Sequence, residues 1–322
     1  MLAAYASAVS ADDPLSALTV GQRPPPRTPD GWTTVTIRAA ALNHHDLWSL
    51  RGVGLPPHRL PMILGTDGAG VDEEGHEVVI HPVIASPDWT GDETLDPQRT
   101  LLSERFDGTL AERVAVPRRN VVRKPPELSF EEAACLPSAW LTAYRMLFTM
   151  ARPDPGSTLL VQGTHGGMSG ALISLGRAAG LEVWATATSE QGVETGRRLG
   201  AHAVFERGAR IPRQVETVAD NVGADTWAHS IRCLKPGGTL VTCGATSGDQ
   251  PGAELRHIFF RQLRVIGTTM GTRHELERLL ALVARTAIRP EIEATYDLSD
   301  ASRAFGRLLS GGVNGKLVLR AS

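Results

Sequence analysis

The strongest constraint on the fold is a regular alternation of short β-type runs with helical segments in the middle of the chain. We predict strands at residues 157–163, 182–187, 203–205, 215–220, 238–244 and 263–269. Strands that alternate with helices in this way form a mostly parallel sheet with helices on both faces. The sequence therefore predicts an α/β domain.

The flanking regions have a different composition and predict a second domain. The first 125 residues are rich in proline and glycine, with β-type runs at 32–40, 76–84 and 112–117 and a long loop at 85–107. A helix is predicted to begin at Ser129, because Glu132 completes the spacing of a capping box. The chain ends in another β-type run, 315–320. Its 322 residues are enough for two domains with separate cores.

The stretch "VQGTHGGMSGALI" at 161–173 joins the first predicted strand of the α/β domain to a helix. A dinucleotide site needs a glycine for the turn, another for close approach of the pyrophosphate, and a small residue where helix meets strand. Ser169 stands in place of the third glycine. The alternative is an ordinary tight turn, and His165 either touches phosphate or fills an insertion. The predicted cofactor contacts in this loop are Gly163, Thr164, His165, Gly166, Gly167 and Met168.

The end of the second predicted strand bears on the choice of cofactor. An acidic residue there normally binds the ribose 2′-hydroxyl, but the chain has Ala187, followed by Thr188 and Ser189. Without a carboxylate, repulsion of a 2′-phosphate is absent and two hydroxyls can donate to it. The sequence favours NADP(H) over NAD(H), although the immediate neighbours Gln191 and Gly192 supply no cation.

Composition restricts the partners and the compartment. Hydrophobic residues make up 42%, charged residues 21%, and the formal net charge is -2, which gives no argument for a nucleic-acid partner. No apolar run approaches the roughly 18 residues that span a bilayer. The N-terminus lacks the pattern of a signal peptide, and the three cysteines show no pairing or ligand spacing. We expect a cytoplasmic, disulfide-free protein without a membrane partner.

Sequence blocks along most of the chain are similar to the medium-chain dehydrogenase/reductase superfamily, and specifically to its zinc-free, quinone-oxidoreductase-like branch. The resemblance rests on the glycine loop and on residues 40–52, 61–71, 108–117, 141–147, 234–248 and 315–318. It implies a Rossmann domain at 126–271 and a GroES-like, mostly β catalytic domain at 1–125, completed by 272–322. It also implies that the cofactor binds in a cleft between them.

The resemblance also bears on metals. Alcohol dehydrogenases of the superfamily hold catalytic zinc with cysteine, histidine and usually an acidic residue, whereas the matching positions here are Asn43, Thr66 and Asp67. A catalytic zinc needs three protein ligands. Residues 85–115 contain no cysteine for the family's structural zinc. His44 and His45 are a poor chelating pair, because adjacent side chains diverge. We expect no metal.

The activity that the resemblance implies is NADPH-dependent reduction of a quinone or an α,β-unsaturated carbonyl. The candidate catalytic residues are Asn43, Asp46 and Asp67. Asn43 is the first candidate for a donor to the substrate oxygen, Asp46 shapes the turn beside it, and Asp67 is either catalytic or structural. The proton comes from solvent or from a histidine. Metal-free alcohol or aldehyde oxidoreduction and a non-catalytic cofactor-binding role are the alternatives. Further cofactor contacts implied by the resemblance are Asn43, Thr142, Gly244, Ala245, Thr246 and Gly267.

Two further expectations concern the edges of the α/β domain. Only nine residues, 206–214, link the third and fourth strands, too few for the usual crossover helix. We predict an extended link that leaves part of one sheet face to be covered by a loop or another subunit. Residues 259–270 are β-rich, and many relatives dimerise through this strand, so we expect a homodimer; an ordinary buried strand is the alternative.

Overall fold

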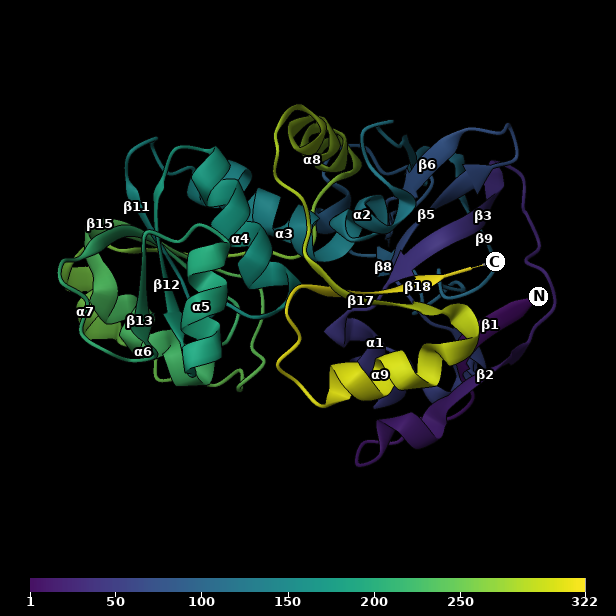
Figure 1. Cartoon of the computed structure of the whole chain (residues 1–322), viewed down its shortest axis with the longest axis horizontal. Coiled ribbons are helices and arrows are strands. Elements are labelled where there is room, and N and C mark those ends of the chain that lie inside the picture. The colour runs from purple at the N-terminus through teal and green to yellow at the C-terminus, as the bar shows by residue number, and fades with distance from the viewer. Residues whose placement is uncertain (322) are drawn as a thin grey trace. The chain divides into compact units, whose positions relative to one another are not determined.

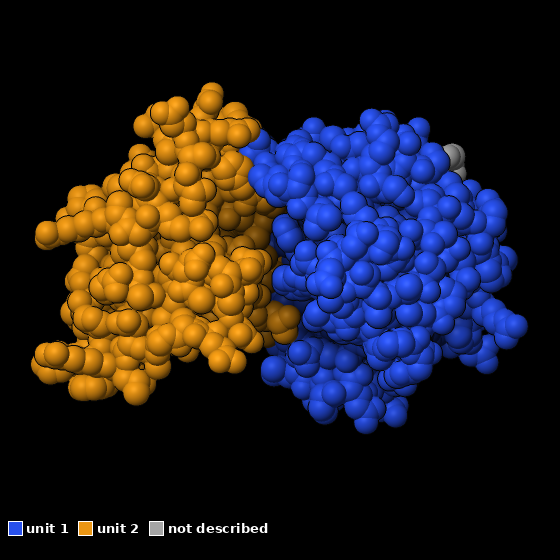
Figure 2. Space-filling view, turned by 90° about the horizontal axis from the view of Figure 1, so that it is seen from below, with its two compact units in different colours: residues 1–141, 270–322 blue, residues 142–269 orange. Residues whose placement is uncertain are grey.

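The computed structural model describes residues 1–321 and contains two compact units (Figures 1 and 2). Unit 1 comprises Met1–Leu141 and Met270–Ser322, and unit 2 comprises Thr142–Thr269. None of the helices within residues 1–321 is long and apolar enough to cross a membrane. Each unit has its own sheet and its own core, so each is described by itself.

Unit 2 contains a six-stranded parallel sheet in the order β13-β12-β11-β14-β15-β16. This is the Rossmann strand order, and the predicted α/β fold class is confirmed. The order reverses between β11 and β14, and ligands of such sheets bind outside the carboxyl ends of the strands at this point. The strands are β11 (Thr158–Val161), β12 (Glu182–Ala187), β13 (Ala203–Glu206), β14 (Val215–Asp220), β15 (Leu234–Thr242) and β16 (Arg264–Gly267). The helices that follow strands are α4 (Gly166–Ala178), α5 (Glu190–Arg198), α6 (Ala224–Cys233) and α7 (Leu255–Phe260).

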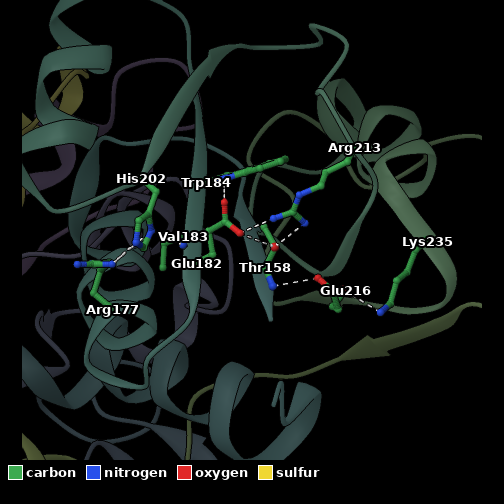
Figure 3. Close-up of polar contacts among 9 residues, drawn as sticks. All are labelled: Thr158, Arg177, Glu182, Val183, Trp184, His202, Arg213, Glu216 and Lys235. Atoms are coloured by element: carbon green, nitrogen blue, oxygen red, sulfur yellow. Dashed lines mark hydrogen bonds and ion pairs between the residues drawn. The ribbon is translucent and has the colours of Figure 1, made fainter. Parts of the chain in front are cut away.

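The link between β13 and β14 contains no helix, as its length predicts. It covers the sheet itself, because Ile211 is buried in the same hydrophobic cluster as Trp184. The Arg213 guanidinium lies 4.8 Å from the centre of the Trp184 ring, donates to Thr158 Oγ1 at 2.9 Å and pairs with Glu182 (Figure 3). The link therefore shields sheet surface that we expected another segment or subunit to cover.

Unit 1 is mostly β, with its main sheet in the order β10-β6-β5-β3-β18-β17 and β9 also paired to β3. The last strand of the chain completes the N-terminal sheet, because β18 pairs antiparallel with β3 and sets Val318 opposite Ala41. The predicted strand at 76–84 is divided into two. The strands are β1 (Leu2–Ala6), β2 (Leu18–Gln22), β3 (Trp32–Ala41), β4 (Met62–Ile63), β5 (Asp67–Asp72), β6 (Glu77–Ile80), β7 (Val83–Ile84), β8 (Thr100–Leu101), β9 (Arg113–Pro117), β10 (Val121–Arg123), β17 (Ile292–Asp297) and β18 (Lys316–Arg320).

Four α-helices belong to unit 1: α1 (His44–Leu50), α2 (Phe130–Ala134), α8 (Arg273–Arg285) and α9 (Ala301–Leu309). The predicted capping box starts α2, since Ser129 Oγ accepts from Glu132 N at 3.1 Å and Glu132 Oε2 accepts from Ser129 N at 2.9 Å. Helical structure continues through π-helical turns and α3 (Leu141–Tyr144) to Ala151. The family resemblance predicts a dinucleotide domain from residue 126, whereas unit 2 begins at Thr142, because α2 packs on β3 and β5 of unit 1.

Candidate cofactor and substrate site

The glycine loop lies between β11 and α4, as predicted, and its backbone requires glycine at two positions. Gly163 and Gly166 have φ of 100° and 80°, in the left-handed region that L side chains avoid. A Cβ on Gly163 would lie 3.2 Å from Ser169 Oγ, whereas a Cβ on Gly166 would meet nothing within 4 Å. Ser169 is buried where the helix meets the strand. A small residue fits there in place of glycine, and the space beside Gly166 is open to a ligand.

A series of buried hydrogen bonds connects this loop to side chains of the neighbouring strands and of α6. Gly163 N donates to Thr186 Oγ1 at 3.1 Å, and Thr186 Oγ1 donates to Gln162 Oε1 at 2.8 Å. Gln162 Nε2 in turn donates to Ser230 Oγ at 2.9 Å, and Ser230 Oγ donates to Asp220 Oδ2 at 2.6 Å. Sequence analysis missed these positioning residues, although a glutamine inside a buried apolar strand is a visible signal. The network fixes the turn, because each buried polar group needs its partner.

The loop also meets the start of α5, where the ribose end of a dinucleotide is expected. A Cβ on Gly192 would lie 2.9 Å from His165 Cε1, 3.0 Å from Ala187 Cβ and 3.1 Å from Thr164 Oγ1. Thr164 Oγ1 is buried and has no hydrogen-bond partner. Ser189 caps α5 by accepting from Gly192 N at 3.1 Å. An orphaned hydroxyl, open space and two helix N-termini fit a phosphate-bearing cofactor.

Four more of the predicted contacts of unit 2 follow or end strands at the same edge of the sheet: Gly244, Ala245, Thr246 and Gly267. Asp220 Oδ1 accepts from Val222 N at 2.9 Å and Gly223 N at 3.1 Å, which shapes the turn after β14. Gly244, Ala245 and Thr246 pack against this turn, and a Cβ on Gly244 would lie 3.2 Å from Asn221 O. Gly267 pairs with Thr242 at the end of β16. Thr142 is buried in α3.

The second cluster belongs to unit 1 and surrounds the buried ammonium of Lys316. Its Nζ donates to Asn43 Oδ1 at 2.6 Å, to Leu42 O at 2.8 Å and to Asp67 Oδ2 at 3.0 Å. Lys316 is 3% exposed and Asp67 is fully buried, so the two form a buried ion pair. Pairing of β18 with β3 brings Lys316 to this position. The structure thus brings Asn43 and Asp67 together through a residue that sequence analysis left without a role, although a lysine in a buried strand is itself a signal.

Asn43 is the start of a second series of hydrogen bonds in this cluster. Its Nδ2 donates to Thr66 Oγ1 at 3.1 Å, and Thr66 Oγ1 lies 3.0 Å from Ser138 Oγ. Because Lys316 holds the amide oxygen, the amide nitrogen must face the hydroxyls. Ser138, from the helical segment after α2, was not predicted. The cluster is therefore an amide, two hydroxyls and a carboxylate already paired with an ammonium.

Asp46 positions the turn that carries Asn43. Asp46 Oδ2 accepts from Asn43 N at 2.8 Å, and Asp46 Oδ1 accepts from Gly65 N at 3.1 Å. Burial raises the pKa of Asp46 to about 6, although the charge of His45 and the hydrogen bond from Asn43 N oppose the rise. Asp46 is fully buried and ties α1 to the strand region before β5. Its contacts are those of a residue that shapes the site.

The two neighbouring histidines point to different surroundings. His44 is exposed, whereas His45 Nε2 lies 3.1 Å from Glu104 Oε1 and His45 Nδ1 is buried without a partner. Burial alone would lower the pKa of His45, but the hydrogen bond to Glu104 and the charges of Asp46, Glu104 and Asp67 raise it. Within residues 1–321, no group of three histidine, cysteine or acidic side chains is arranged to hold a metal ion.

A glycine loop at the switch point of a parallel sheet, together with a separate β unit carrying a buried polar cluster, defines the class of nicotinamide-dependent oxidoreductases. Known proteins agree. Residues 29–126 match the alcohol dehydrogenase GroES-like domain, and residues 167–285 match the zinc-binding dehydrogenase family. A crystal structure described as an NAD-dependent alcohol dehydrogenase is 32% identical, covers 100% of both chains and superposes with a TM-score of 0.92.

Two curated relatives reduce acyl-CoA compounds, according to their names. The crotonyl-CoA reductase of Streptomyces collinus is 27% identical over 91% of this chain and 79% of its own. The acryloyl-coenzyme A reductase of Metallosphaera sedula is 27% identical over 91% of this chain and 93% of its own. The chain belongs to the medium-chain dehydrogenase/reductase superfamily, and the prediction of this superfamily is confirmed.

Proposed function

We propose that the protein is a zinc-independent reductase that uses NADPH to reduce an α,β-unsaturated carbonyl compound, with quinones as the related substrate class. The observation that carries the proposal is the Asn43 amide, locked by the buried Lys316 ammonium at a position where alcohol dehydrogenases of the superfamily carry a zinc ligand. The relatives named for crotonyl-CoA and acryloyl-CoA support this substrate class, because both names denote conjugated carbonyl compounds.

Hydride transfer to such a substrate places negative charge on its carbonyl oxygen, and the proposed role of the unit 1 cluster is to stabilise this charge. The reduced nicotinamide, when bound, supplies the hydride. Asn43 Nδ2 carries two protons and gives one to Thr66, which leaves the second for a substrate oxygen. Lys316 places a fixed positive charge behind the same amide. Donors held in position before the reaction stabilise a developing oxyanion without the cost of reorganisation.

We infer that the cluster does not bind zinc. A catalytic zinc site takes thiolate, imidazole or carboxylate ligands from three residues. The cluster has an amide at Asn43 and hydroxyls at Thr66 and Ser138, and the carboxylate of Asp67 is already paired with Lys316. The donor set therefore does not fit the metal.

The reduced substrate also needs a proton, which comes either from solvent or from His45. His45 is the histidine of this region whose pKa is raised, against the effect of burial, by its bond to Glu104 and by nearby carboxylates. A His45→Gln variant separates the two sources. A proton from His45 predicts that the basic limb of the pH–rate profile disappears in the variant, whereas a proton from solvent predicts an unchanged profile.

The test of the proposed function is NADPH oxidation by the full-length protein across enoyl thioesters, enones, quinones and simple aldehydes. We expect turnover with one of the first three classes, unchanged after treatment with a strong chelator. Activity confined to aldehydes or alcohols would favour the alternative that the NAD-dependent alcohol dehydrogenase structure suggests. Tight NADPH binding without turnover of any compound would favour a non-catalytic role, and loss of activity with chelator would contradict zinc independence.

We also propose that the protein is a homodimer joined through the edge of the unit 2 sheet. β16 is the last strand of that sheet, and Val265 on it is 40% exposed. Phe259 and Phe260 on the preceding α7 are 68% and 78% exposed. An open strand edge beside exposed aromatic side chains is suited to pairing with a second copy. Light scattering of the wild type and of a Phe259→Ser, Phe260→Ser variant tests this, with a shift to monomer expected in the variant.

A further inference from the structure

The preference for NADP(H) in the proposed function lacks one component, a cation for the 2′-phosphate. The residues after β12 offer hydroxyls at Thr188 and Ser189 but no positive charge before the end of α5. A 2′-phosphate without a cationic partner would gain little over a hydroxyl. The inference below rests on the proposed function, because it assigns that cation.

The missing cation directly follows the neighbouring strand. β13 pairs parallel with β12, which sets Glu206 opposite Ala187. Arg207 N, the next residue along, donates to Ala187 O at 2.8 Å. Because parallel strands end at the same edge of a sheet, Arg207 lies beside the turn that carries Thr188 and Ser189. The short link keeps it there, since Ala209 N donates to Glu206 O at 3.0 Å and Ala209 O accepts from His229 Nε2 at 2.9 Å.

The side chain of Arg207 is not engaged by any other residue that the structure describes. It is exposed, and within residues 1–321 it makes no hydrogen bond or ion pair. Arg213 of the same link differs, because it is engaged with Glu182, Thr158 and Trp184 (Figure 3). A guanidinium that is fixed at its backbone and free at its head group is suited to binding a phosphate from solution.

Two carboxylates in the neighbourhood must be considered. Glu206 is the last residue of β13 and directly precedes Arg207, but within residues 1–321 the two side chains form no ion pair. Glu190 is the first residue of α5 and is exposed. The α5 N-terminus itself favours an anion, since its dipole is positive there and Ser189 Oγ keeps its own proton for donation. Glu190 is the group that would oppose a phosphate and favour a ribose hydroxyl instead.

We propose that Arg207, together with the hydroxyls of Thr188 and Ser189, forms the subsite for the 2′-phosphate of NADP(H) and determines the choice of cofactor. The adenosine ribose then lies at the carboxyl ends of β12 and β13. His165 borders the same subsite, because its ring packs against Gly192 in the first turn of α5. The subsite combines residues that follow two different strands and that only the pairing of β12 with β13 brings together.

Calorimetric titration of the full-length protein tests the subsite with four ligands: NADPH, NADH, 2′,5′-ADP and 5′-AMP. We expect the wild type to bind NADPH more tightly than NADH. Arg207→Gln should weaken binding of NADPH and 2′,5′-ADP by about tenfold to a hundredfold, the value of a charged hydrogen bond. Binding of NADH and 5′-AMP should stay within about twofold. Arg207→Lys should lie between, since it keeps the charge and loses the planar fork.

Arg210→Gln is the matched control, because Arg210 is exposed on the same link and likewise makes no hydrogen bond or ion pair within the described residues. It should leave all four affinities unchanged. Equal losses in Arg207→Gln and Arg210→Gln, or no loss in the first, would overturn the assignment. So would a wild type that binds NADH as tightly as NADPH, with affinity for NADH lost in Glu190→Gln. Failure of the wild type to bind either cofactor would instead reject the proposed function.

Discussion

The two clusters described above are assembled in opposite ways. The glycine loop of unit 2 is contiguous in sequence, from Gly163 to Ser169, and its strand and helix are its immediate neighbours. The cluster of unit 1 joins Asn43, Asp67, Ser138 and Lys316, which are separated by up to 273 positions. A glycine-rich turn can be recognised from spacing because its geometry is local. A cluster of polar side chains from distant segments exists only once the sheet has formed.

The largest expected effect comes from breaking the buried ion pair with Lys316→Met. Asp67 would be left as a buried, unpaired carboxylate, and the loss of stability should be about 3–5 kcal/mol. Urea titration measures it. Lys235→Met is the control, because Lys235 pairs with Glu216 at 2.8 Å on an exposed surface of unit 2 (Figure 3) and should cost no more than about 1 kcal/mol. Similar losses in the two variants would contradict the structural role assigned to the buried pair of the unit 1 cluster.

The next effect concerns catalysis by the unit 1 cluster. Asn43→Ala removes the amide donor proposed to face the substrate oxygen and should lower kcat by about 100- to 1000-fold. Steady-state kinetics with the preferred substrate measure kcat, and titration with NADPH measures the affinity for the cofactor. We expect kcat to fall far more than the affinity for NADPH. An equal fall in both would mean that Asn43 serves the cofactor and not the substrate.

His81 offers a pH-dependent test of long-range assembly in unit 1. His81 Nε2 lies 2.8 Å from Gly271 O, and burial lowers the pKa of His81 to about 4. Below pH 6.5 His81 binds a proton in the unfolded chain but stays neutral in the folded chain. The free energy of unfolding therefore decreases as pH falls from 6.5 towards 4. For a shift of this size the loss is about 3 kcal/mol.

The measurement is the difference in unfolding free energy between wild type and His81→Gln across this pH range. Glutamine keeps a donor near Nε2 and does not titrate. We expect the wild type to be the more stable at pH 7 and its advantage to shrink towards pH 4. A difference that stays constant with pH would show that His81 is protonated in the folded protein or is not buried.

The smallest expected effect tests the local cluster of unit 2. Gly163→Ala forces an L residue into the left-handed region, at a cost of about 1–2 kcal/mol, and brings its Cβ to 3.2 Å from Ser169 Oγ. Thermal unfolding with and without NADPH reads both stability and binding. We expect a lower midpoint and a smaller shift with NADPH. Gly252→Ala, where a Cβ would meet nothing within 4 Å, should change neither.

Prediction from sequence succeeded where the determining interactions are short-range. The capping box at Ser129 and Glu132 needs only a spacing of three, and it starts α2 as expected. The six strands of unit 2 follow from local patterns. The place of Ser169, the small residue at the start of α4, follows from its spacing to the glycines of the loop. The partners of these groups lie in the next strand or turn, so their arrangement is implied by the order of residues.

Prediction was incomplete where partners come from distant strands. Lys316 belongs to a sequence block typical of the superfamily, but its contacts require the pairing of β18 with β3. The segment after β12 contains no cation before the end of α5, whereas parallel pairing places Arg207, which follows β13, beside this segment. Gln162 and Ser138 are polar residues in buried segments, and that property alone did not identify their partners.

The sequence by itself determined the fold class, the place of the glycine loop and the superfamily, because spacing and local patterns encode these directly. Only the tertiary structure decided which side chains meet. It paired Asp67 with Lys316, turned the Asn43 amide toward Thr66 and set Arg207 beside Ala187. The physical reason is that buried charges and polar groups must find partners, and strand pairing, not chain order, determines which partners are within reach.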